Sequence, residues 1–195
     1  MEYKEEEEKI VFFDEFAVYD RPSIFYGWAP KNTRPEIPSN EKGRRNKLNG
    51  MISVDAFTGK EYLELKEKSK TEDVSEYFIQ LCQDCIKEGF NKLTVILDNN
   101  STHKNKMKSQ VTAHLHRLKI QEKIEINFIH TPTYSPSFNL VEYIIHLLRL
   151  RLLHHLPLGV NIQQVKDKLD NYFKFNQLQT PEQIHNIIEH ICALV

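Results

Sequence analysis

The chain has 195 residues, a length that suits one sizeable domain with a large buried core. Hydrophobic residues at 40% and charged residues at 27% describe an ordinary soluble globular protein, and the net charge of −1 gives no global signature of nucleic-acid binding. The longest strongly apolar stretch, Leu140 to Leu156, contains a glutamate, two arginines and three histidines, which excludes a membrane span.

The N-terminus is acidic, and no basic segment followed by an apolar one marks a signal peptide. The three cysteines, Cys82, Cys85 and Cys192, are few and odd in number, which suits a reducing compartment. We therefore expect a cytoplasmic protein with no membrane partner.

Basic residues gather in local clusters although the net charge is close to zero. Local patches matter more than net charge for contact with phosphates. Each cluster taken singly is more often a solvated surface than a binding site. The clusters are Lys42, Arg44, Arg45 and Lys47; Lys104, Lys106 and Lys108; Arg117 and Lys119; and Arg149 and Arg151.

The first 65 residues read as a β-meander behind a flexible start. Residues 1–9 form a charge run that we expect to be frayed, and residues 10–195 form a single domain. The apolar run of residues 10–13 predicts a strand buried on both faces. Asp14 and Glu15 interrupt this strand, unless it ends at Phe13 and Asp14 begins a turn. Further strands are predicted over residues 23–28, 47–57 and 61–65.

Helices and two more buried strands follow. A helix over 71–89, capped by Thr71, precedes a strand at 93–97 with Asp98 directly after it. A basic helix over 104–118 leads to a strand over 124–129. Later helices are predicted from the Ser135-Pro136 cap to about residue 155, over 161–175, and over 181–193 behind a Thr180 cap. This order predicts a mixed α/β sheet with an antiparallel front and parallel additions.

Three carboxylates stand out by their positions. Asp14 interrupts the first apolar strand, Asp98 ends a later buried strand, and Glu142 begins an apolar helix. If the two strands are neighbours and the helix packs across their ends, the three side chains converge. Such a cluster cannot stay ionised in a half-buried pocket without a cation. Oxygen ligands favour Mg²⁺ or Mn²⁺, and two such ions about 3.5–4 Å apart catalyse phosphoryl transfer.

Other signals have simpler explanations. Glu142 alone reads as an acid near a helix start, where it favours the helix dipole. Cys82 and Cys85 have redox or zinc spacing, but both fall on the apolar stripe of a predicted helix, so core packing is the favoured role. No glycine-rich phosphate loop and no serine hydrolase elbow is present, which disfavours an ATPase and a serine hydrolase.

The motifs around these acids resemble those of DDE-type transposases of the mariner superfamily, in particular its bacterial insertion-sequence branch. Residues 98–104, DNNSTHK, resemble the second-aspartate motif, and residues 132–142, PTYSPSFNLVE, resemble the Pro-x-Tyr-Ser-Pro…Asn-Pro-Ile-Glu signature. Residues 13–15 resemble the first-aspartate strand, residues 28–31 the tryptophan motif after it, and the basic segment 42–49 also fits. The pieces occur in order from about residue 10 to the end, and the combination is more specific than any single piece.

The resemblance implies a ribonuclease-H-like fold, with a five-stranded mixed sheet flanked by helices. It implies two Mg²⁺ or Mn²⁺ ions held by Asp14, Asp98 and Glu142, which act in DNA cleavage and in strand transfer by the freed 3′-hydroxyl. Asn99 and His103 would line the site; otherwise they are a turn-stabilising asparagine and a surface histidine. The residues expected to contact DNA are Asn99, His103, Lys104, Arg44, Arg45 and Lys47.

The sequence also departs from the family pattern. Leu140 stands where the family has proline after asparagine, and 43 residues separate Asp98 from Glu142, several more than is usual. Members of the family normally carry a helix-turn-helix region before the catalytic domain, whereas the first catalytic strand is predicted here nine residues from Met1. We therefore expect a truncated copy, or a frameshift partner of a helix-turn-helix subunit encoded upstream.

The expected partner is double-stranded DNA, both element ends and target. A homodimer would hold the two ends together in a bacterial cytoplasm, with the protein on the nucleoid when it is bound to DNA. Two alternatives stay open. One is a metal-dependent nuclease of the same fold without strand transfer. The other is an inactive remnant that only binds DNA or a transposase subunit.

Overall fold

The computed structural model describes residues 7–21, 30–33, 46–99, 105–132, 135–157 and 159–193. In this part of the chain a five-stranded sheet has the order β3-β2-β1-β4-β5. Its strands are β1 (Glu8–Tyr19), β2 (Lys47–Asp55), β3 (Glu61–Lys66), β4 (Lys92–Leu97) and β5 (Glu125–His130). The helices are α1 (Thr71–Lys87), α2 (Asn105–Arg117), α3 (Leu140–Leu148), α4 (Ile162–Phe175) and α5 (Pro181–Cys192).

The sheet is mixed, as the order of predicted elements requires. β1 pairs antiparallel with β2, and β2 with β3, whereas β1 pairs parallel with β4, and β4 with β5. The predicted antiparallel front and parallel additions are confirmed. This is the five-stranded arrangement, flanked by helices, of ribonuclease-H-like catalytic cores.

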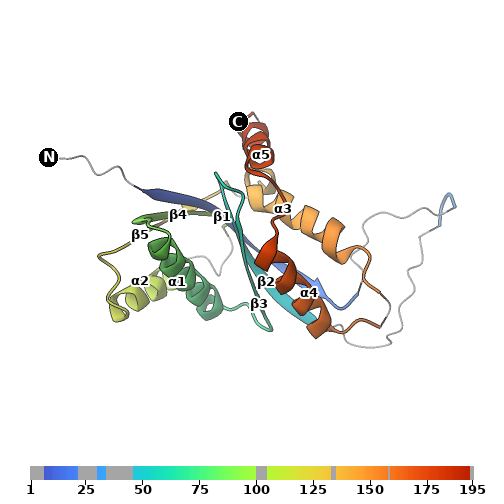
Figure 1. Ribbon diagram of the computed structural model, residues 1–195, viewed down its shortest axis with the longest axis horizontal. Helices are drawn as coiled ribbons and strands as arrows, with labels where there is room; N and C mark the ends of the chain where they lie inside the picture. Colours follow the sequence, from blue (N-terminus) through green and yellow to red (C-terminus); the bar gives the residue numbers. More distant parts are fainter. Residues whose placement is uncertain are drawn as a thin grey trace.

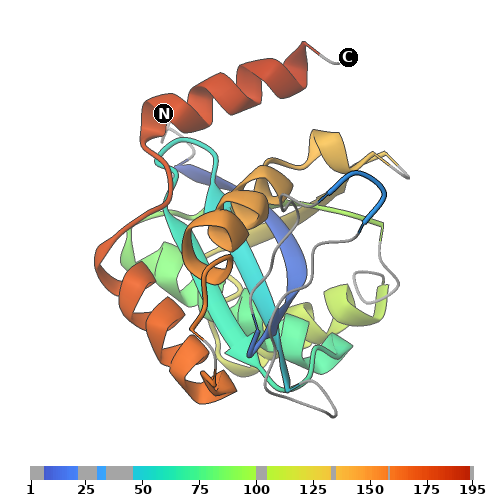
Figure 2. The ribbon, with the colours of Figure 1, turned by 90° about the vertical axis from the view of Figure 1, so that its right-hand side faces the viewer.

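Helices cover both faces of the sheet. Figure 1 shows α1 and α2 on one side and α3, α4 and α5 on the other. In Figure 2 α3 crosses in front of the long strands, and α5 lies at the edge of the molecule with the C-terminus at its end. Each face has its own apolar core: Phe13 and Phe78 belong to the α1 side, Phe12 and Ile144 to the α3 side.

The side chains of β1 alternate between these two cores. Val11 and Phe13 are buried toward α1, and Phe12, Phe16 and Val18 toward α3. Because successive side chains of a strand point to opposite faces, Asp14 shares the α3 face with Phe12 and Phe16. β1 runs without a break through this aspartate, so the alternative in which the strand ends at Phe13 is wrong.

Local signals located most elements to within two residues and missed some of their ends. β1 begins at Glu8, two residues before the predicted start. Thr71 is the first residue of α1 and not its cap, whereas the predicted Thr180 cap of α5 is confirmed, since its hydroxyl accepts from the Gln183 amide at 3.3 Å. The strand predicted over residues 23–28 lies outside the described residues.

The two neighbouring cysteines are core residues, as their place on the apolar stripe of α1 predicts. Cys82 and Cys85 are both buried and carry free thiols. Burial raises the pKa of each thiol to about 12, so neither is a thiolate at neutral pH. Among the described residues, no helix combines the length and the apolar character that crossing a membrane requires.

A buried lysine fixes the beginning of β1. Lys9, only 3% exposed, donates to the Tyr62 hydroxyl at 2.6 Å, lies 3.5 Å from an Asp55 carboxylate oxygen, and also bonds the Glu88 carboxylate. Burial alone would lower the pKa of Lys9, but the bonds to Glu88 and Tyr62 reverse the effect and raise it. The lysine therefore stays charged and ties β1 to β3 and to the end of α1.

This cluster predicts a large difference between two lysines that bond the same carboxylate. Lys9→Met leaves Glu88 and Asp55 without their buried cation and should lower the free energy of unfolding by about 3 kcal/mol. Lys60, whose side chain is 53% exposed and lies 2.6 Å from Glu88, is the matched control. Lys60→Met should cost less than about 1 kcal/mol. Urea denaturation measures both; equal losses would contradict the role assigned to Lys9.

Candidate metal centre

The parallel pairing of β1 with β4 aligns two of the three predicted acids. The register pairs Glu8 with Lys92 and ends with Phe12 opposite Ile96. The same offset, continued for two more residues, places Asp14 level with Asp98. Phe12 and Ile96 both pack into the core on the α3 side. The two aspartates follow them at a spacing of two residues, so they emerge on the same face.

The third acid comes from α3, which packs across β1 and β2 on that face. Glu142 lies in the first turn of this helix. The predicted start of this helix at Ser135 is wrong. Residues Pro136–Phe138 form a separate 3₁₀ turn, and Asn139 is the N-cap of α3. A serine followed by proline suits the first turn of a helix of either kind, which explains the error.

Asn139 fixes α3 to β1 beside Asp14. Its side-chain oxygen accepts from the Val141 amide at 3.3 Å, and its side-chain nitrogen donates to the carbonyl of Phe13 at 3.1 Å. The residue is only 2% exposed. One side chain therefore caps the helix that carries Glu142 and holds it against the residue preceding Asp14. Leu140, which replaces the family proline, is fully buried at the first helical position.

The pKa of Asp14 is raised, and the other two acids are among the causes. Burial, the charges of Glu142 and Asp98, and a hydrogen bond to Glu142 together raise this pKa to about 7. The Glu15 backbone amide, which donates to Asp14 at 2.7 Å, lowers it in part. The structure thus places Glu142 and Asp98 within electrostatic range of Asp14. Ionising Asp14 beside two other carboxylates is costly unless a cation compensates the charge.

The three carboxylates have the chemistry that a divalent ion needs, but their side chains are not arranged at the distances of metal ligands. Over the described residues, no group of three or more His, Cys, Asp and Glu side chains is close enough together to hold a metal ion. Three half-buried carboxylates are nevertheless the kind of oxygen ligands that Mg²⁺ and Mn²⁺ prefer. Their mutual repulsion is the cost that such an ion would remove.

The segment after β4 is tied to the end of β5. The Asn99 side chain donates to the Thr131 carbonyl at 2.6 Å, and His130 Nδ1 lies 3.0 Å from the carbonyl oxygen of Asp98. The Thr131 amide donates to the Leu97 carbonyl at 2.9 Å. Asn99 therefore has the turn-stabilising role, directly after Asp98 in the chain.

Of the basic residues predicted to contact DNA, only Lys47 falls in the described ranges. It is exposed at the start of β2, opposite Tyr19 at the end of β1. At about 3.3 Å per residue, this position is roughly 17 Å along β1 from Asp14. Arg44, Arg45, His103 and Lys104 lie outside the described residues, as does part of the tryptophan motif, residues 28 and 29.

Sequence reasoning missed Asn139 and His130 as residues that support the site. The family signature included Asn139, and its spacing of three residues before Glu142 is the spacing of a helix cap. This spacing favours a cap at Asn139, but Ser135-Pro136 is the stronger local pattern for a helix start. No sequence signal identifies the contact of His130 with Asp98, because it depends on the pairing of β4 with β5.

The raised pKa of Asp14 predicts how stability depends on pH without metal. The folded chain binds this proton more tightly than the unfolded chain, so the carboxyl lowers the free energy of unfolding as pH rises from about 4 to about 7. In EDTA at pH 8, Asp14→Asn should therefore be more stable than the native chain by about 1–3 kcal/mol, and at pH 4 the gain should vanish. Urea titrations at both pH values measure this, with the exposed Asp170→Asn as control. A native chain that is more stable than Asp14→Asn at pH 8 would contradict the assignment.

A comparison with Asn161 distinguishes the role of Asn139 at the site from that of an ordinary helix cap. Asn161 caps α4 by accepting from the Gln164 amide at 2.9 Å, but it is exposed and α4 carries none of the acids. Both alanine variants should lose about 1 kcal/mol of stability from the cap. Only Asn139→Ala should also weaken Mn²⁺ binding, measured by calorimetry, because only Asn139 positions Glu142 against β1. Equal Mn²⁺ affinities in the two variants would refute this role.

Comparison with known proteins agrees with the geometry. A family model described as DDE superfamily endonuclease matches residues 9–159. Curated protein sequences give no match. Among solved structures, the Mos1 strand transfer complex has 17% identity and a TM-score of 0.63, covering 93% of this chain and 52% of that chain. The Mos1 mariner paired end complex with Mg has 16% identity and a TM-score of 0.65, covering 96% of this chain and 54% of that chain.

A retroviral assembly shares the fold as well. The simian T-cell lymphotropic virus intasome in complex with the PP2A regulatory subunit B56 gamma has 16% identity and a TM-score of 0.53, covering 90% of this chain and 53% of that one. At these identities the likeness shows the fold, and this chain spans about half the length of the Mos1 chains it matches. The family model, in contrast, covers most of the sequence, including Asp14, Asp98 and Glu142. The chain therefore belongs to the DDE superfamily endonucleases.

Proposed function

We propose that this chain is the catalytic domain of a DNA transposase that cuts a DNA strand and joins the freed 3′-hydroxyl to target DNA. The observation that carries the proposal is the meeting of Asp14, Asp98 and Glu142 on one face of a DDE endonuclease fold. We assign it to the bacterial insertion-sequence branch of the mariner superfamily. The support for that branch is the motif pair at residues 98–104 and 132–142, together with the likeness to the Mos1 mariner transposase structures.

In this proposal Asp14, Asp98 and Glu142 hold two Mg²⁺ or Mn²⁺ ions. When bound, such a pair polarises the attacking oxygen and stabilises the leaving oxygen of a phosphodiester. Mos1 paired end complexes with Mn and with Mg support this choice of metals.

The chain's own residues prepare the site for that chemistry. Burial of Asp14 favours its protonated form at neutral pH, so metal binding would release this proton. Asn139 sets the position of Glu142 against β1, and Asn99 and His130 hold the backbone around Asp98. The acids therefore come from rigid elements, which is the arrangement that precise phosphoryl transfer needs.

The proposed substrate is double-stranded DNA, both element ends and target. Lys47 is exposed at the start of β2, beside the carboxyl end of β1, and can neutralise a phosphate some distance from the cut. We assign Arg44, Arg45, His103 and Lys104 to the same task from the sequence motifs. The support from structure is that Mos1 transposase has been seen in paired-end complexes with a transposon end.

The proposal includes partners for the recognition of element ends. We propose that two copies act together, each with a helix-turn-helix subunit encoded upstream, on the nucleoid in a bacterial cytoplasm. The support is that the Mos1 chains, seen in a paired-end complex with a transposon end, are about twice as long as the part that matches this chain. A search of the DNA directly upstream for such a reading frame tests this part.

The function predicts metal-dependent nicking of a labelled duplex. The purified chain should nick DNA in Mg²⁺ or Mn²⁺, and Asp98→Asn and Glu142→Gln should each lose at least about 100-fold in rate, because each removes one proposed ligand of an ion that stabilises the transition state. Glu64→Gln, a change of the same kind on β3, is the control and should cut normally.

The products separate the competing functions. A strand-transfer product, detected as the labelled 3′ end joined to a second duplex, supports a transposase. Nicking without any joined product supports a nuclease of the same fold. A native chain that neither cuts DNA nor binds Mn²⁺ supports an inactive remnant and contradicts the proposal.

A further inference from the structure

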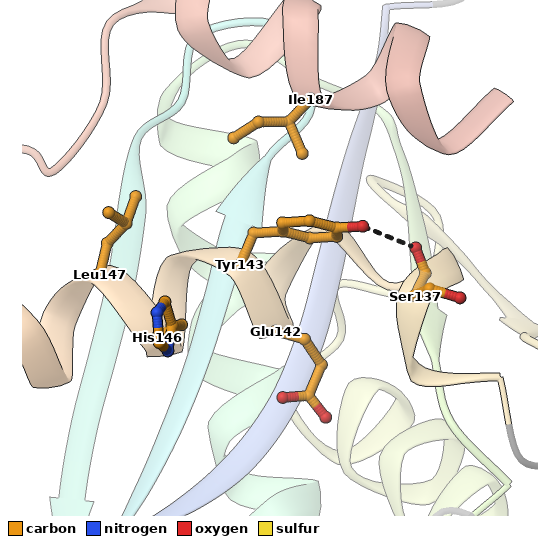
Figure 3. Close-up of a pocket in the computed structure, with 6 residues that line it drawn as sticks. All are labelled: Ser137, Glu142, Tyr143, His146, Leu147 and Ile187. Carbon is orange, nitrogen blue, oxygen red and sulfur yellow. Dashed lines mark hydrogen bonds between the residues drawn. The ribbon is translucent and has the colours of Figure 1, made fainter. Parts of the chain in front are cut away.

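The hollow beside the acids belongs to the site already described. It has a volume of about 640 Å³, lies between α3 and α5, and has Glu142 in its wall. Figure 3 shows the Tyr143 ring between this carboxylate and Ile187. The surface of α2, on the opposite face of the sheet (Figure 1), is a separate feature that the proposed function leaves unexplained.

The helix α2 and the turn after it carry an excess of positive charge. Between residues 105 and 123 the chain has five basic residues and one acid, Glu122. The first two bases have partners on α1 and β5, whereas the other three are exposed around the end of the helix. Within the described part of the chain, no carboxylate forms an ion pair with Lys119 or Lys123. The five bases are Lys106, Lys108, Arg117, Lys119 and Lys123.

The end of α2 has the hydrogen bonds of a Schellman motif. The Lys119 amide donates to the His116 carbonyl at 3.0 Å, and the Ile120 amide donates to the Leu115 carbonyl at 3.1 Å. Ile120 also packs against the core that contains Leu115, which is the apolar contact that often accompanies the motif. Lys119 therefore occupies the position after the helix cap where the backbone is left-handed, and its φ is 57°.

A lysine is an unfavourable residue for this position. The left-handed conformation brings Cβ too close to the following carbonyl oxygen, a strain that glycine avoids and asparagine tolerates. The helix α1 ends in the same motif with a glycine: the Gly89 amide donates to the Ile86 carbonyl, and the Phe90 amide to the Cys85 carbonyl. Among the described non-glycine residues, only Asn32 also has a positive φ. The fold thus uses glycine at one helix end and keeps a lysine at the other.

The contacts of Lys119 do not account for this strain. Its side chain is exposed, and its ammonium group has no partner among the described residues. Backbone strain of this kind is concentrated at functional positions. What lysine adds over glycine is a positive charge on a rigid turn, and such a charge suits an anionic partner.

The position of this charge fits DNA that is bound at the acids. The strands β4 and β5 are parallel, with Lys92 opposite Glu125, so the turn before β5 lies at the end of the sheet away from Asp98. The helix α2 connects the two ends, and its 13 residues extend about 20 Å. At about 3.4 Å per base pair, this length matches roughly six base pairs of duplex. One duplex can therefore reach both the acids and the basic turn, which favours DNA over an acidic protein segment.

We propose that the end of α2 contacts phosphates of the duplex outside the cleavage site, with Lys119 at the centre of this contact and Arg117 and Lys123 beside it. The proposal rests on the proposed function, since it needs DNA at the acids. Contacts to phosphates carry no sequence information, so this surface adds affinity for any duplex. The three bases are positioning residues that hold the DNA and do not touch the reacting phosphate.

Two substitutions of Lys119 separate its charge from its backbone. Lys119→Gly removes both the charge and the strain, and Lys119→Gln removes the charge alone. Binding of a fluorescent duplex is measured by anisotropy over a range of salt concentrations, with Ca²⁺ in place of Mg²⁺ so that the duplex is not cut. Both variants should bind roughly 5- to 10-fold more weakly at about 0.1 M salt, and the slope of log affinity against log salt should become shallower by about 0.9, as one lost phosphate contact predicts.

The melting temperature gives a second readout that separates the two variants. Lys119→Gly should raise it by about 2–4 °C because the strain is relieved. Lys119→Gln should leave it unchanged, since glutamine is strained in the same way as lysine. A glycine variant that is more stable and yet binds DNA more weakly would show that the lysine is kept for its charge.

Two controls test whether charge at this position is the cause. Lys119→Arg keeps the charge and should keep both the affinity and the salt slope. Lys174→Gln removes an exposed lysine from α4, on the other side of the sheet, and should also keep both.

The outcomes separate this inference from the proposed function. If the native chain nicks DNA in Mg²⁺ while Lys119→Gln binds the duplex with native affinity and salt slope, the inference is wrong and the function stands. Equal losses in Lys119→Gln and Lys174→Gln would also overturn it, because they would show a general effect of net charge. A native chain that neither nicks nor binds the duplex overturns both.

Discussion

The parallel pairing of β1 with β4 is the constraint on which the rest of the structure depends. Its register, continued for two residues beyond the last pair, places Asp14 level with Asp98 and on the same face of the sheet. Everything else at the site is fitted to that face: α3 crosses it, Asn139 bonds the Phe13 carbonyl, and Glu142 is thereby held toward both aspartates. A shift of this register by one residue would turn one aspartate to the opposite core. Parallel strands need a long connection, and α1 with the β2–β3 hairpin supplies it.

The acid cluster shows how function opposes stability in this fold. Without metal, Asp14 is held among like charges in a half-buried position, so its ionised form weakens the native state above pH 7. Strong interactions elsewhere in the fold offset this loss of stability. Near the start of β1, Lys9 bonds Tyr62 and Glu88 and holds the strand that carries the acid in place. β1 is therefore firmly anchored on one side of a site whose charges repel one another.

Much of the fold could be predicted from the sequence because its signals are local. Continuous apolar runs mark β1 and β4, and Asp98 directly after a buried strand indicates the edge of a sheet where ligands gather. The errors come from contacts between distant residues. The sequence predicts a charged tail up to Lys9, because the partners of this lysine, Tyr62 and Glu88, are more than 50 residues away. It predicts a helix start at Ser135, because the contact that fixes the true start, between Asn139 and Phe13, spans 126 residues. The convergence of the acids follows from strand order, which the sequence only suggested.

The central claim is that Asp14, Asp98 and Glu142 together bind divalent metal ions. The most direct measurement is a crystal structure of the chain grown with Mn²⁺, in which anomalous scattering locates manganese independently of any model of the protein. We expect two manganese peaks about 3.5–4 Å apart, between Asp14 within β1, Asp98 directly after β4 and the first turn of α3, with all three carboxylates as ligands. Strong manganese peaks at other side chains, with these three carboxylates turned apart and unliganded, would contradict it.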